Sequence, residues 1–404
     1  MHDFEFFNPT KIIYGVNKVK NVGEYVNAYT KTKKILLVIS ESCKRNGLLQ
    51  IVIDSLNQNN ITFYIVDEIV PNPTLECVYK GKKICKEHEI DFILAIGGAS
   101  VVDTAKSISV ASYNEDDIWN LVCNPSLIKG AIPLGTIITL YGSGTEMTNG
   151  AVISNVEIPK KRGFDSIYMY PKFSILDPTT LESCSQEHLM IGMTDMFTHI
   201  LEDYFEITDE YNLADDFQKL LVKDMIVEFE KANKGLQDNN KLLWMSTLAQ
   251  NKFLSFGKKY NGEWVAHIIA HEFCVKYNFP HGKVVAILFV SWLNFIKEEN
   301  KKRIIDFGKD VFGLEMPTVD DVIIEIKKIY KLLGNVLSFK ELGVKQEDID
   351  EIVENAMLGK KLGKYKLLDK NDVKNIIVGG YYENNTKWIN WYGFEMEKIF
   401  SRWW

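Results

Sequence analysis

The spacing of apolar and polar residues changes character about half-way along the chain. In the first part, short β-branched runs alternate with stretches whose apolar residues recur at helical spacing. The pattern predicts strands at 35–39, 61–66, 92–96 and 132–138, with helices near 47–57, 75–88 and 101–112. Strands that alternate with helices predict βαβ units on a parallel sheet, with ligands bound beyond the carboxyl ends of the strands.

From about residue 185 the apolar spacing is helical almost throughout. It predicts helices at 187–205, 211–233, 240–258, 262–276, 319–334 and 346–358. A turn-forming cluster at 177–180 precedes this region, so we expect an α/β domain over 1–184 and a helical domain over 185–404. The stretch from Tyr381 to Trp404 is crowded with aromatic residues, and it fits either a packed terminal helix or a surface for docking a partner.

Composition narrows the class of protein. The 404 residues carry a net charge of −7, which argues against a nucleic-acid or anionic-membrane partner, and 12% aromatic residues argue against a disordered chain. The six cysteines form no C-x-x-C pair, so reduced thiols in a cytoplasmic protein are the simplest interpretation. The N-terminus lacks the features of a signal peptide, and no apolar run is long enough to span a bilayer.

Two glycine-containing turns follow predicted strands. Gly97-Gly98-Ala99-Ser100 comes between a strand and a helix, where backbone N–H groups can approach a phosphate and Ser100 can cap the helix or donate to the phosphate. The segment 139–146 is rich in glycine and hydroxyl groups and also follows a strand. Either one alone could be an ordinary turn, but two at the carboxyl ends of strands favour a nucleotide site.

Four of the seven histidines lie between residues 199 and 281. Asp195 and His199 are four residues apart in one helical pattern, and His267 and His271 repeat that spacing in another. His281 follows between a proline and a glycine, which should end the helix and turn this residue back toward it. A lone buried histidine is more often a hydrogen-bonded core residue, but so many polar groups in apolar helices favour a divalent metal site. The H-E-x-x-H motif is absent, which disfavours a metallopeptidase.

Taken in order, these segments resemble the iron-containing alcohol dehydrogenase family, and most closely its butanol-dehydrogenase and aldehyde-reductase branch. The resemblance runs from Asn8 to about residue 362 and rests on markers at 71–74, 97–103, 139–146, 171–178, 192–205, 262–272 and 280–282. Ala99 stands where the family has a third glycine, which requires that this residue not adopt a positive φ. Tyr141 and Gly142 also depart from the family's pattern.

The resemblance implies a Rossmann-like dinucleotide-binding domain followed by an all-α metal-binding domain, the architecture shared with dehydroquinate synthase, and a homodimer or higher homo-oligomer. It implies Asp195, His199, His267 and His281 as ligands of Fe²⁺ or Zn²⁺. His271 becomes an unligated neighbour lining the substrate pocket. Because imidazole titrates near neutral pH, we expect His271 to relay the substrate's hydroxyl proton to solvent as the catalytic residue. The implied cofactor contacts are Ser42, Asn72, Gly97, Gly98, Ser100, Asp103, Thr139, Ser143 and Lys161.

The implied reaction is reversible hydride transfer between a small, butanol-like primary alcohol or its aldehyde and NAD or NADP. After the first predicted strand, Ser40 and Ser42 with the nearby basic residues favour NADP, whereas Glu41 favours NAD; on balance the sequence favours NADP. Alternatives are a lyase of the dehydroquinate-synthase type, a metal-dependent hydrolase and an inactive family member. Against the lyase, the metal motifs are flanked by apolar residues: Phe197, Trp264, Ile268, Ile269 and Phe273.

Overall fold

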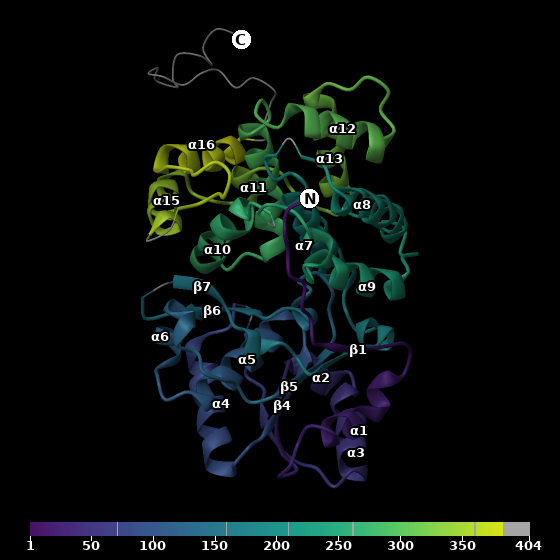
Figure 1. Cartoon of the computed structure of the whole chain (residues 1–404), viewed down its shortest axis with the longest axis vertical. Helices are drawn as coiled ribbons and strands as arrows, with labels where there is room; N and C mark the ends of the chain where they lie inside the picture. The colour runs from purple at the N-terminus through teal and green to yellow at the C-terminus, as the bar shows by residue number, and fades with distance from the viewer. Residues whose placement is uncertain (71, 159, 209, 261, 359–360, 383–404) are drawn as a thin grey trace.

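The computed structural model describes residues 1–70, 72–158, 160–208, 210–260, 262–358 and 361–382. The molecule is elongated, with the sheet and its helices in one half and a helical layer in the other (Figure 1). None of the described helices is both long enough and apolar enough to cross a bilayer.

A six-stranded parallel sheet forms the centre of the first half. Its strands are β1 (Lys11–Tyr14), β2 (Lys34–Ile39), β3 (Thr62–Val66), β4 (Phe92–Gly97), β5 (Leu134–Ile138) and β8 (Phe173–Leu176). Their order is β1-β8-β5-β4-β2-β3, and every neighbouring pair is parallel. The chain passes from β2 outward to β3, at the edge of the sheet, and then returns to β4, which lies on the other side of β2. The carboxyl ends of β2 and β4 therefore flank the switch point at which such sheets bind ligands.

Helices cover both faces of this sheet: α1 (Val22–Asn27), α2 (Glu41–Arg45), α3 (Leu48–Gln58), α4 (Leu75–His88), α5 (Ala99–Tyr113) and α6 (Ile118–Cys123). Alternate residues of β2 face opposite sides. Ile35 and Leu37 share a core with α1 and α3, whereas Leu36 and Val38 share the other core with α4 and α5. Burial on both faces explains the continuous apolar run of this strand and confirms the predicted α/β arrangement.

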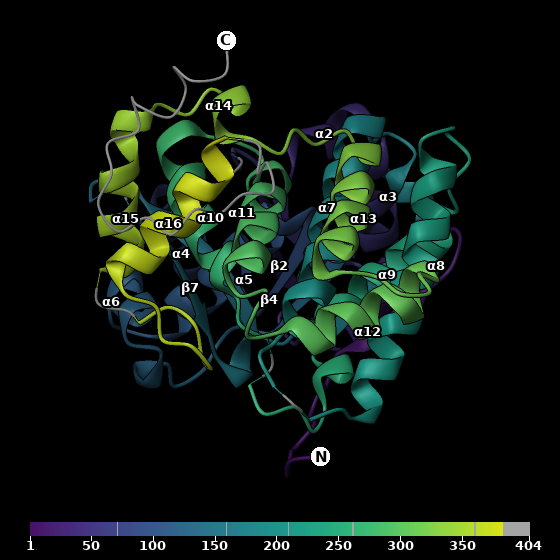
Figure 2. The same ribbon diagram turned by 90° about the horizontal axis from the view of Figure 1, so that it is seen from above.

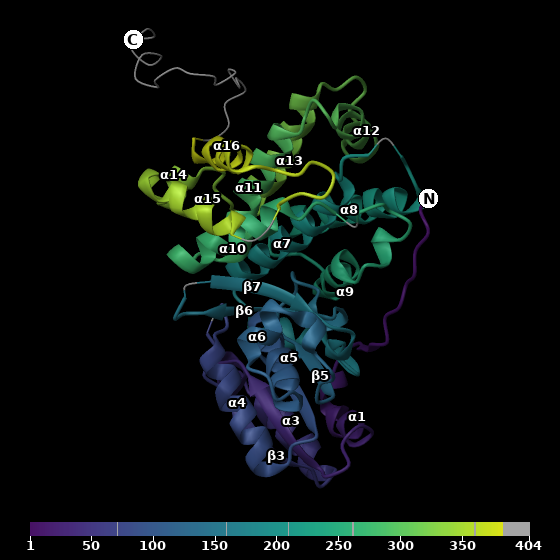
Figure 3. The ribbon, with the colours of Figure 1, turned by 60° about the vertical axis from the view of Figure 1, so that its left-hand side comes forward.

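An antiparallel hairpin, β6 (Gly150–Asn155) and β7 (Lys160–Asp165), separates the sheet from the helical half (Figure 3). The hydrophobic pattern did not predict it. Short 3-10 turns occur at Lys18–Asn21, Pro125–Leu127, Thr145–Met147, Ile167–Met169, Pro178–Leu181, Phe253–Ser255 and Gln346–Asp348.

The second half is helical, as predicted. It contains α7 (Gln186–Tyr204), α8 (Leu213–Ala232), α9 (Asn239–Gln250), α10 (Val265–Tyr277), α11 (His281–Phe295), α12 (Lys301–Phe312), α13 (Val319–Leu332), α14 (Phe339–Leu342), α15 (Ile349–Met357) and α16 (Lys370–Tyr381). The almost wholly buried α11 lies among α7, α10 and α16 (Figure 2). The helix predicted over 240–258 ends earlier, since Lys252 adopts a φ of 66°. Most of the aromatic C-terminal stretch lies outside the described residues.

Candidate metal and cofactor site

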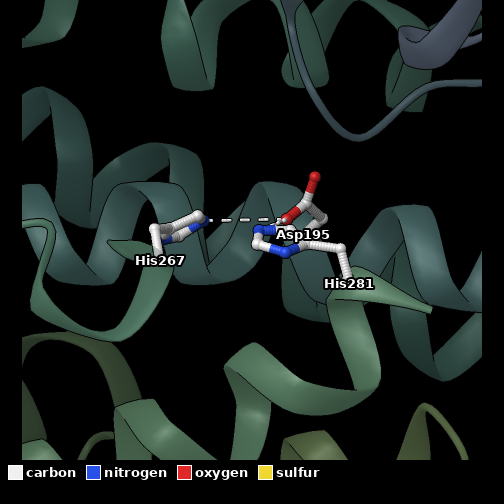
Figure 4. A group of neighbouring side chains, drawn as sticks. All are labelled: Asp195, His267 and His281. Carbon is white, nitrogen blue, oxygen red and sulfur yellow. Dashed lines mark ion pairs between the residues drawn. The ribbon is translucent and has the colours of Figure 1, made fainter. Parts of the chain in front are cut away.

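Three helices supply the predicted metal ligands. Asp195 and His199 lie one turn apart on α7, His267 lies on α10, and His281 is the first residue of α11. In Figure 4, Asp195, His267 and His281 converge, and each can place one ligand atom within 4.8 Å of the others. His199 lies beside this group, with its ring stacked on that of His267 at a centroid distance of 4.5 Å.

One oxygen of Asp195 lies at the centre of the group. Its Oδ1 atom is 3.9 Å from Nε2 of His199, 3.7 Å from Nε2 of His267 and 3.8 Å from Nε2 of His281. Nitrogen and oxygen ligands lie about 2.0–2.2 Å from Zn²⁺, so two ligands of one ion can be up to about 4.4 Å apart. All three distances satisfy that limit.

Several polar atoms of the group are buried without a hydrogen bond. They are Oδ1 of Asp195, Nε2 of His267 and Nδ1 of His199. A buried polar atom left unsatisfied costs about 1–3 kcal/mol, and two of these atoms point toward the centre of the group. A divalent cation would satisfy those two, Oδ1 of Asp195 and Nε2 of His267, so the donor set fits a transition metal.

Glu202 orients one of the proposed ligands. It lies one helical turn after His199 and is completely buried. Nδ1 of His267 donates to Oε2 of Glu202 in a short hydrogen bond, which leaves Nε2 facing Asp195. Oε1 accepts the backbone N–H of Ala266 at 2.8 Å, which ties α7 to the first turn of α10. Glu202 lies within the matched segment 192–205, but no role for it was predicted from the sequence. Its spacing of one helical turn from His199 was the feature that could have placed it beside the site.

Burial and charge set the protonation of the group. Burial outweighs the attraction of Asp195 and lowers the pKa of His199 to about 4 and of His281 to about 3. Both imidazoles are therefore neutral at neutral pH, the form that binds metals. Burial also opposes the charge on His267, but the carboxylates of Glu202 and Asp195 raise its pKa to about 9. These carboxylates thus favour positive charge at the centre of the site.

His271 lies beside the proposed ligands but outside their cluster. Its ring centroid is 5.5 Å from that of His281. A small cavity is lined by His271 and Ile268 of α10 and by the basic residues of β7, at 160–162. The place of His271 in a substrate pocket stays a prediction.

The glycine turn lies between β4 and α5 as predicted. Gly98 is the N-cap of α5, and no side chain caps this helix, so the predicted capping role of Ser100 is wrong. Ala99 is the first residue of α5 and is not among the described residues with positive φ, so alanine is tolerated here. The N–H groups of Val101 and Val102 donate to the carbonyl of Gly98, at 3.1 and 3.2 Å, so the preceding N–H groups, of Ala99 and Ser100, are the ones that a phosphate could accept.

The second segment meets the metal-bearing helix. Thr139 follows β5 and donates its N–H to the carbonyl of Gly97 at 3.1 Å, and Ser143 lies four residues further on. Gly142 has a φ of 135°, and a Cβ added to Gly192 of α7 would lie only 2.3 Å from the carbonyl oxygen of Tyr141. Glycine at both positions therefore allows the cofactor side and the metal side of the site to touch.

Asp103 is engaged within the protein. It accepts the hydroxyl of Thr145 and the N–H of Val152, each at 3.0 Å. The buried ammonium of Lys106, one turn later, donates to the carbonyl oxygens of Thr145 at 2.7 Å, Thr148 at 2.9 Å and Gly150 at 2.8 Å. These contacts favour a role for Asp103 in shaping the cofactor turn rather than touching the cofactor. No role for Lys106 was predicted from the sequence, although a lysine in an otherwise apolar helix could have indicated a buried structural contact.

Two more predicted cofactor residues are in contact. The ammonium of Lys161, on β7, donates to Oδ1 of Asn72 at 2.7 Å, although the two residues are 89 positions apart. Asn72 precedes α4 in a left-handed conformation with φ 59°. The structure thus brings the loop before α4 and the hairpin together at the edge of the site.

The loop after β2 carries both hydroxyls and charges. The Ser40 and Ser42 hydroxyls are 2.9 Å apart. The ammonium of Lys44 is 2.5 Å from a carboxylate oxygen of Asp67 and 3.2 Å from one of Glu41. Lys44, one of the basic residues after the first predicted strand that were expected to favour NADP, is therefore already paired with two acids.

The predicted apolar wall is only partly present. Trp264 lies with its ring centroid 5.4 Å from that of His267, and Ile268 lines the cavity beside His271. Phe197, Ile269 and Phe273 are instead buried in the helical core. Helical spacing alone could not tell which face of α7 or α10 lines the site and which packs into the core, because both faces carry apolar residues.

Comparisons with known proteins identify the family. Residues 9–178 match the family model "Iron-containing alcohol dehydrogenase", and residues 189–380 match "Fe-containing alcohol dehydrogenase family, C-terminal". The chain is 35% identical to a probable NADH-dependent butanol dehydrogenase 1 of Bacillus subtilis (93% of this chain, 99% of that protein) and 30% identical to NADH-dependent butanol dehydrogenase A of Clostridium acetobutylicum (94% and 100%).

A solved structure gives the same result at the level of the fold. The crystal structure of NADH-dependent butanol dehydrogenase A from Thermotoga maritima superposes with a TM-score of 0.90 at 31% identity, covering 94% of this chain and 99% of that one. The parallel sheet with its helical second half is thus the fold of these enzymes. The chain belongs to the iron-containing alcohol dehydrogenase family.

Proposed function

We propose that this enzyme interconverts small, butanol-like primary alcohols and their aldehydes, with a nicotinamide cofactor as the hydride carrier and a metal held by Asp195, His199, His267 and His281. The observation that carries the proposal is the group of three imidazole nitrogens within 3.7–3.9 Å of one buried carboxylate oxygen. A divalent ion bound there supplies Lewis-acid chemistry to the substrate oxygen; Fe²⁺ and Zn²⁺ both suit these ligands.

The protein's own residues prepare both sides of the reaction. Glu202 holds His267 in the tautomer whose Nε2 faces the site. The first turn of α5 offers backbone N–H groups to the pyrophosphate, and Asp103 with Lys106 fixes the neighbouring turn. Passage of the substrate's hydroxyl proton through His271 stays a prediction, supported by its place next to His281.

We further propose that NADH is the better cofactor. The sequence favoured NADP because of the serines and basic residues after β2, but Lys44 is paired with Asp67 and Glu41. Two carboxylates at this position repel a 2′-phosphate, whereas the Ser40 and Ser42 hydroxyls and a carboxylate suit a free ribose hydroxyl. Initial rates at matched concentrations of NADH and NADPH test this preference.

The substrate's far end would lie toward the cavity beside His271. Its lining combines Ile268, Ala356 and Leu358 with the basic residues 160–162 of β7. Basic residues at this place would suit the phosphate and carboxylate groups of a lyase's sugar-acid phosphate substrate, but the near full-length similarity to butanol dehydrogenases favours an alcohol or aldehyde. An aldehyde panel that pairs butanal with a four-carbon aldehyde bearing a terminal carboxylate would show whether the basic strand selects anionic substrates.

The test of the function uses protein purified without oxygen and analysed for metal. We expect about one Fe²⁺ or Zn²⁺ per chain and oxidation of NADH when butanal is added. Stoichiometric metal and bound NADH with no turnover of any aldehyde would support the inactive-member alternative, and a chain that binds metal but no nicotinamide would support the hydrolase alternative. A cytoplasmic location and a homodimer or higher homo-oligomer complete the proposal.

A further inference from the structure

Hydrogen bonds between side chains cross the site at its edge. Lys161 donates to Oδ1 of Asn72 at 2.7 Å, and Nδ2 of Asn72 donates to Oδ1 of Asn278 at 3.1 Å. Lys161 and Asn72 belong to the α/β half, whereas Asn278 caps the carboxyl end of α10, the helix that carries His267. The bond to Asn278 therefore links the cofactor side to the metal side.

Asn278 occupies a fixed position. Its N–H donates to the carbonyl of Cys274 at 3.0 Å, and its φ of 54° ends α10. The residue before it, Tyr277, accepts the N–H of Lys345 at 2.9 Å and donates to Asp348. Lys276 forms ion pairs with Asp348 and Glu351 of the α15 region. The end of α10 is thus anchored to the helical half.

Asn72 is half-buried, and the orientation of its side chain is set by the hydrogen bonds to Lys161 and Asn278. Its backbone is left-handed, and the nearest backbone bond of its loop runs from Ser154 N–H to the carbonyl of Pro73 at 2.8 Å. Among the described residues, no carboxylate lies within ion-pair distance of Lys161, so the Asn72 carbonyl is the acceptor that holds its ammonium. The orientation of one amide therefore determines where this positive charge lies.

We propose that Asn278 is a positioning residue for the cofactor: by accepting a hydrogen bond from Asn72, it fixes the amide whose other end holds Lys161. The inference rests on the proposed function and on the prediction, made from the family resemblance, that Asn72 and Lys161 contact its nicotinamide cofactor. Removal of the acceptor should loosen the loop before α4 and weaken cofactor binding, while the metal ligands keep their places.

The test compares two substitutions at one position. Asn278→Gly removes the acceptor but keeps a residue that adopts positive φ without strain. Asn278→Asp keeps the acceptor and also tolerates this conformation. Asn60→Gly is the matched control, because Asn60 is an exposed asparagine with φ 54° in the turn after α3. The measurements are metal content, the Kd of NADH by fluorescence, kcat, and amide hydrogen exchange of the segment 72–75.

For Asn278→Gly we expect faster exchange in 72–75 and a Kd for NADH raised about three- to tenfold, the range for loss of one hydrogen bond. Its kcat at saturating NADH should change by less than about twofold, and its metal content should equal that of the unsubstituted protein. Asn278→Asp and Asn60→Gly should behave like the unsubstituted protein.

Unchanged exchange and Kd in Asn278→Gly would overturn the proposal, as would loss of metal in that variant or equal effects in Asn60→Gly. The exchange measurement needs no cofactor. If the unsubstituted chain bound neither NADH nor NADPH, the proposed function would fail, while exchange in 72–75 would still decide whether Asn278 positions Asn72.

Discussion

At the level of single residues, the direction in which His267 presents its lone pair depends on Glu202. An imidazole that faces a metal with one nitrogen carries its proton on the other, and a buried carboxylate on that side fixes both the tautomer and the ring orientation. Glu202 also holds the first turn of α10 through the N–H of Ala266. The same carboxylate therefore controls the ligand and the helix that carries it.

We expect Glu202→Gln to lower metal affinity about 10–100-fold, the usual range for loss of such a partner. The amide keeps the size of the side chain but removes the negative charge that makes His267 a stronger ligand. Titration with a competing chelator measures the change. Glu299→Gln, which affects an ion pair with Lys366 on the surface, is the control and should leave metal affinity unchanged. Equal affinities in both variants would contradict an orienting role for Glu202.

Asp91 gives a pH-dependent prediction away from the site. Burial raises the pKa of its carboxyl, but hydrogen bonds from the Thr30 hydroxyl and from the N–H groups of Lys31 and Thr32 outweigh burial and lower it. A carboxyl with a lowered pKa stabilises the fold above its unfolded pKa of about 3.9, and this stability is lost as the pH falls through the folded value.

Asp91→Asn should therefore reduce the free energy of unfolding more at pH 7 than at low pH, with the difference from the unsubstituted protein shrinking below about pH 4. Urea unfolding at a series of pH values measures this. Asp54→Asn, on the exposed side of α3, serves as the control. A difference that stays constant with pH would contradict the assignment.

At the level of elements, the sequence predicted those helices and strands whose apolar pattern reflects burial in the core. The bounds of α4 are 75–88 in both prediction and structure, and the strands β2 and β4 were found because their apolar runs are buried on both faces. The hairpin was missed because β7 reads Lys-Lys-Arg-Gly-Phe-Asp, which has no apolar alternation. Its position depends on contacts with α10 and α6, which a local pattern cannot contain.

The contact of α7 with the second glycine segment leads to another prediction. Gly192→Ala would place a Cβ 2.3 Å from the carbonyl oxygen of Tyr141. Alanine favours a helix over glycine by about 1 kcal/mol, but a backbone atom must move, and overpacking costs about 1–3 kcal/mol. We expect net destabilisation in urea, together with lower turnover because α7 carries Asp195. In Gly163→Ala the added Cβ would lie 3.8 Å from Cγ2 of Val152, an ordinary contact, so stability should change little. Equal effects of the two substitutions would rule out the clash.

At the level of the whole molecule, the order of motifs predicted which residues would meet, although residues as distant as Asn72 and Lys161 meet only through the fold. The metal group was predictable because Asp195 and His199 have helical spacing, because three further histidines follow in apolar helices, and because its polar atoms are costly to bury without an ion. The sequence could not predict that Lys44 pairs with Asp67 or that Phe197 and Phe273 point into the core, since both features depend on tertiary neighbours. The division at residue 184, like the individual site roles, stays a prediction.

Because the proposed ligands come from α7, α10 and α11, a bound ion links three helices of the second half. An ion that binds only the folded protein stabilises it by about 2.7 kcal/mol when its free concentration is 100 times its Kd. We therefore expect a chelator to lower the Tm, and Zn²⁺ or Fe²⁺ to restore it in a concentration-dependent way. Asp195→Asn removes the central carboxylate, so its Tm should not respond to the metal. If that variant showed the full metal-dependent shift, the ion would be bound at another place in the chain.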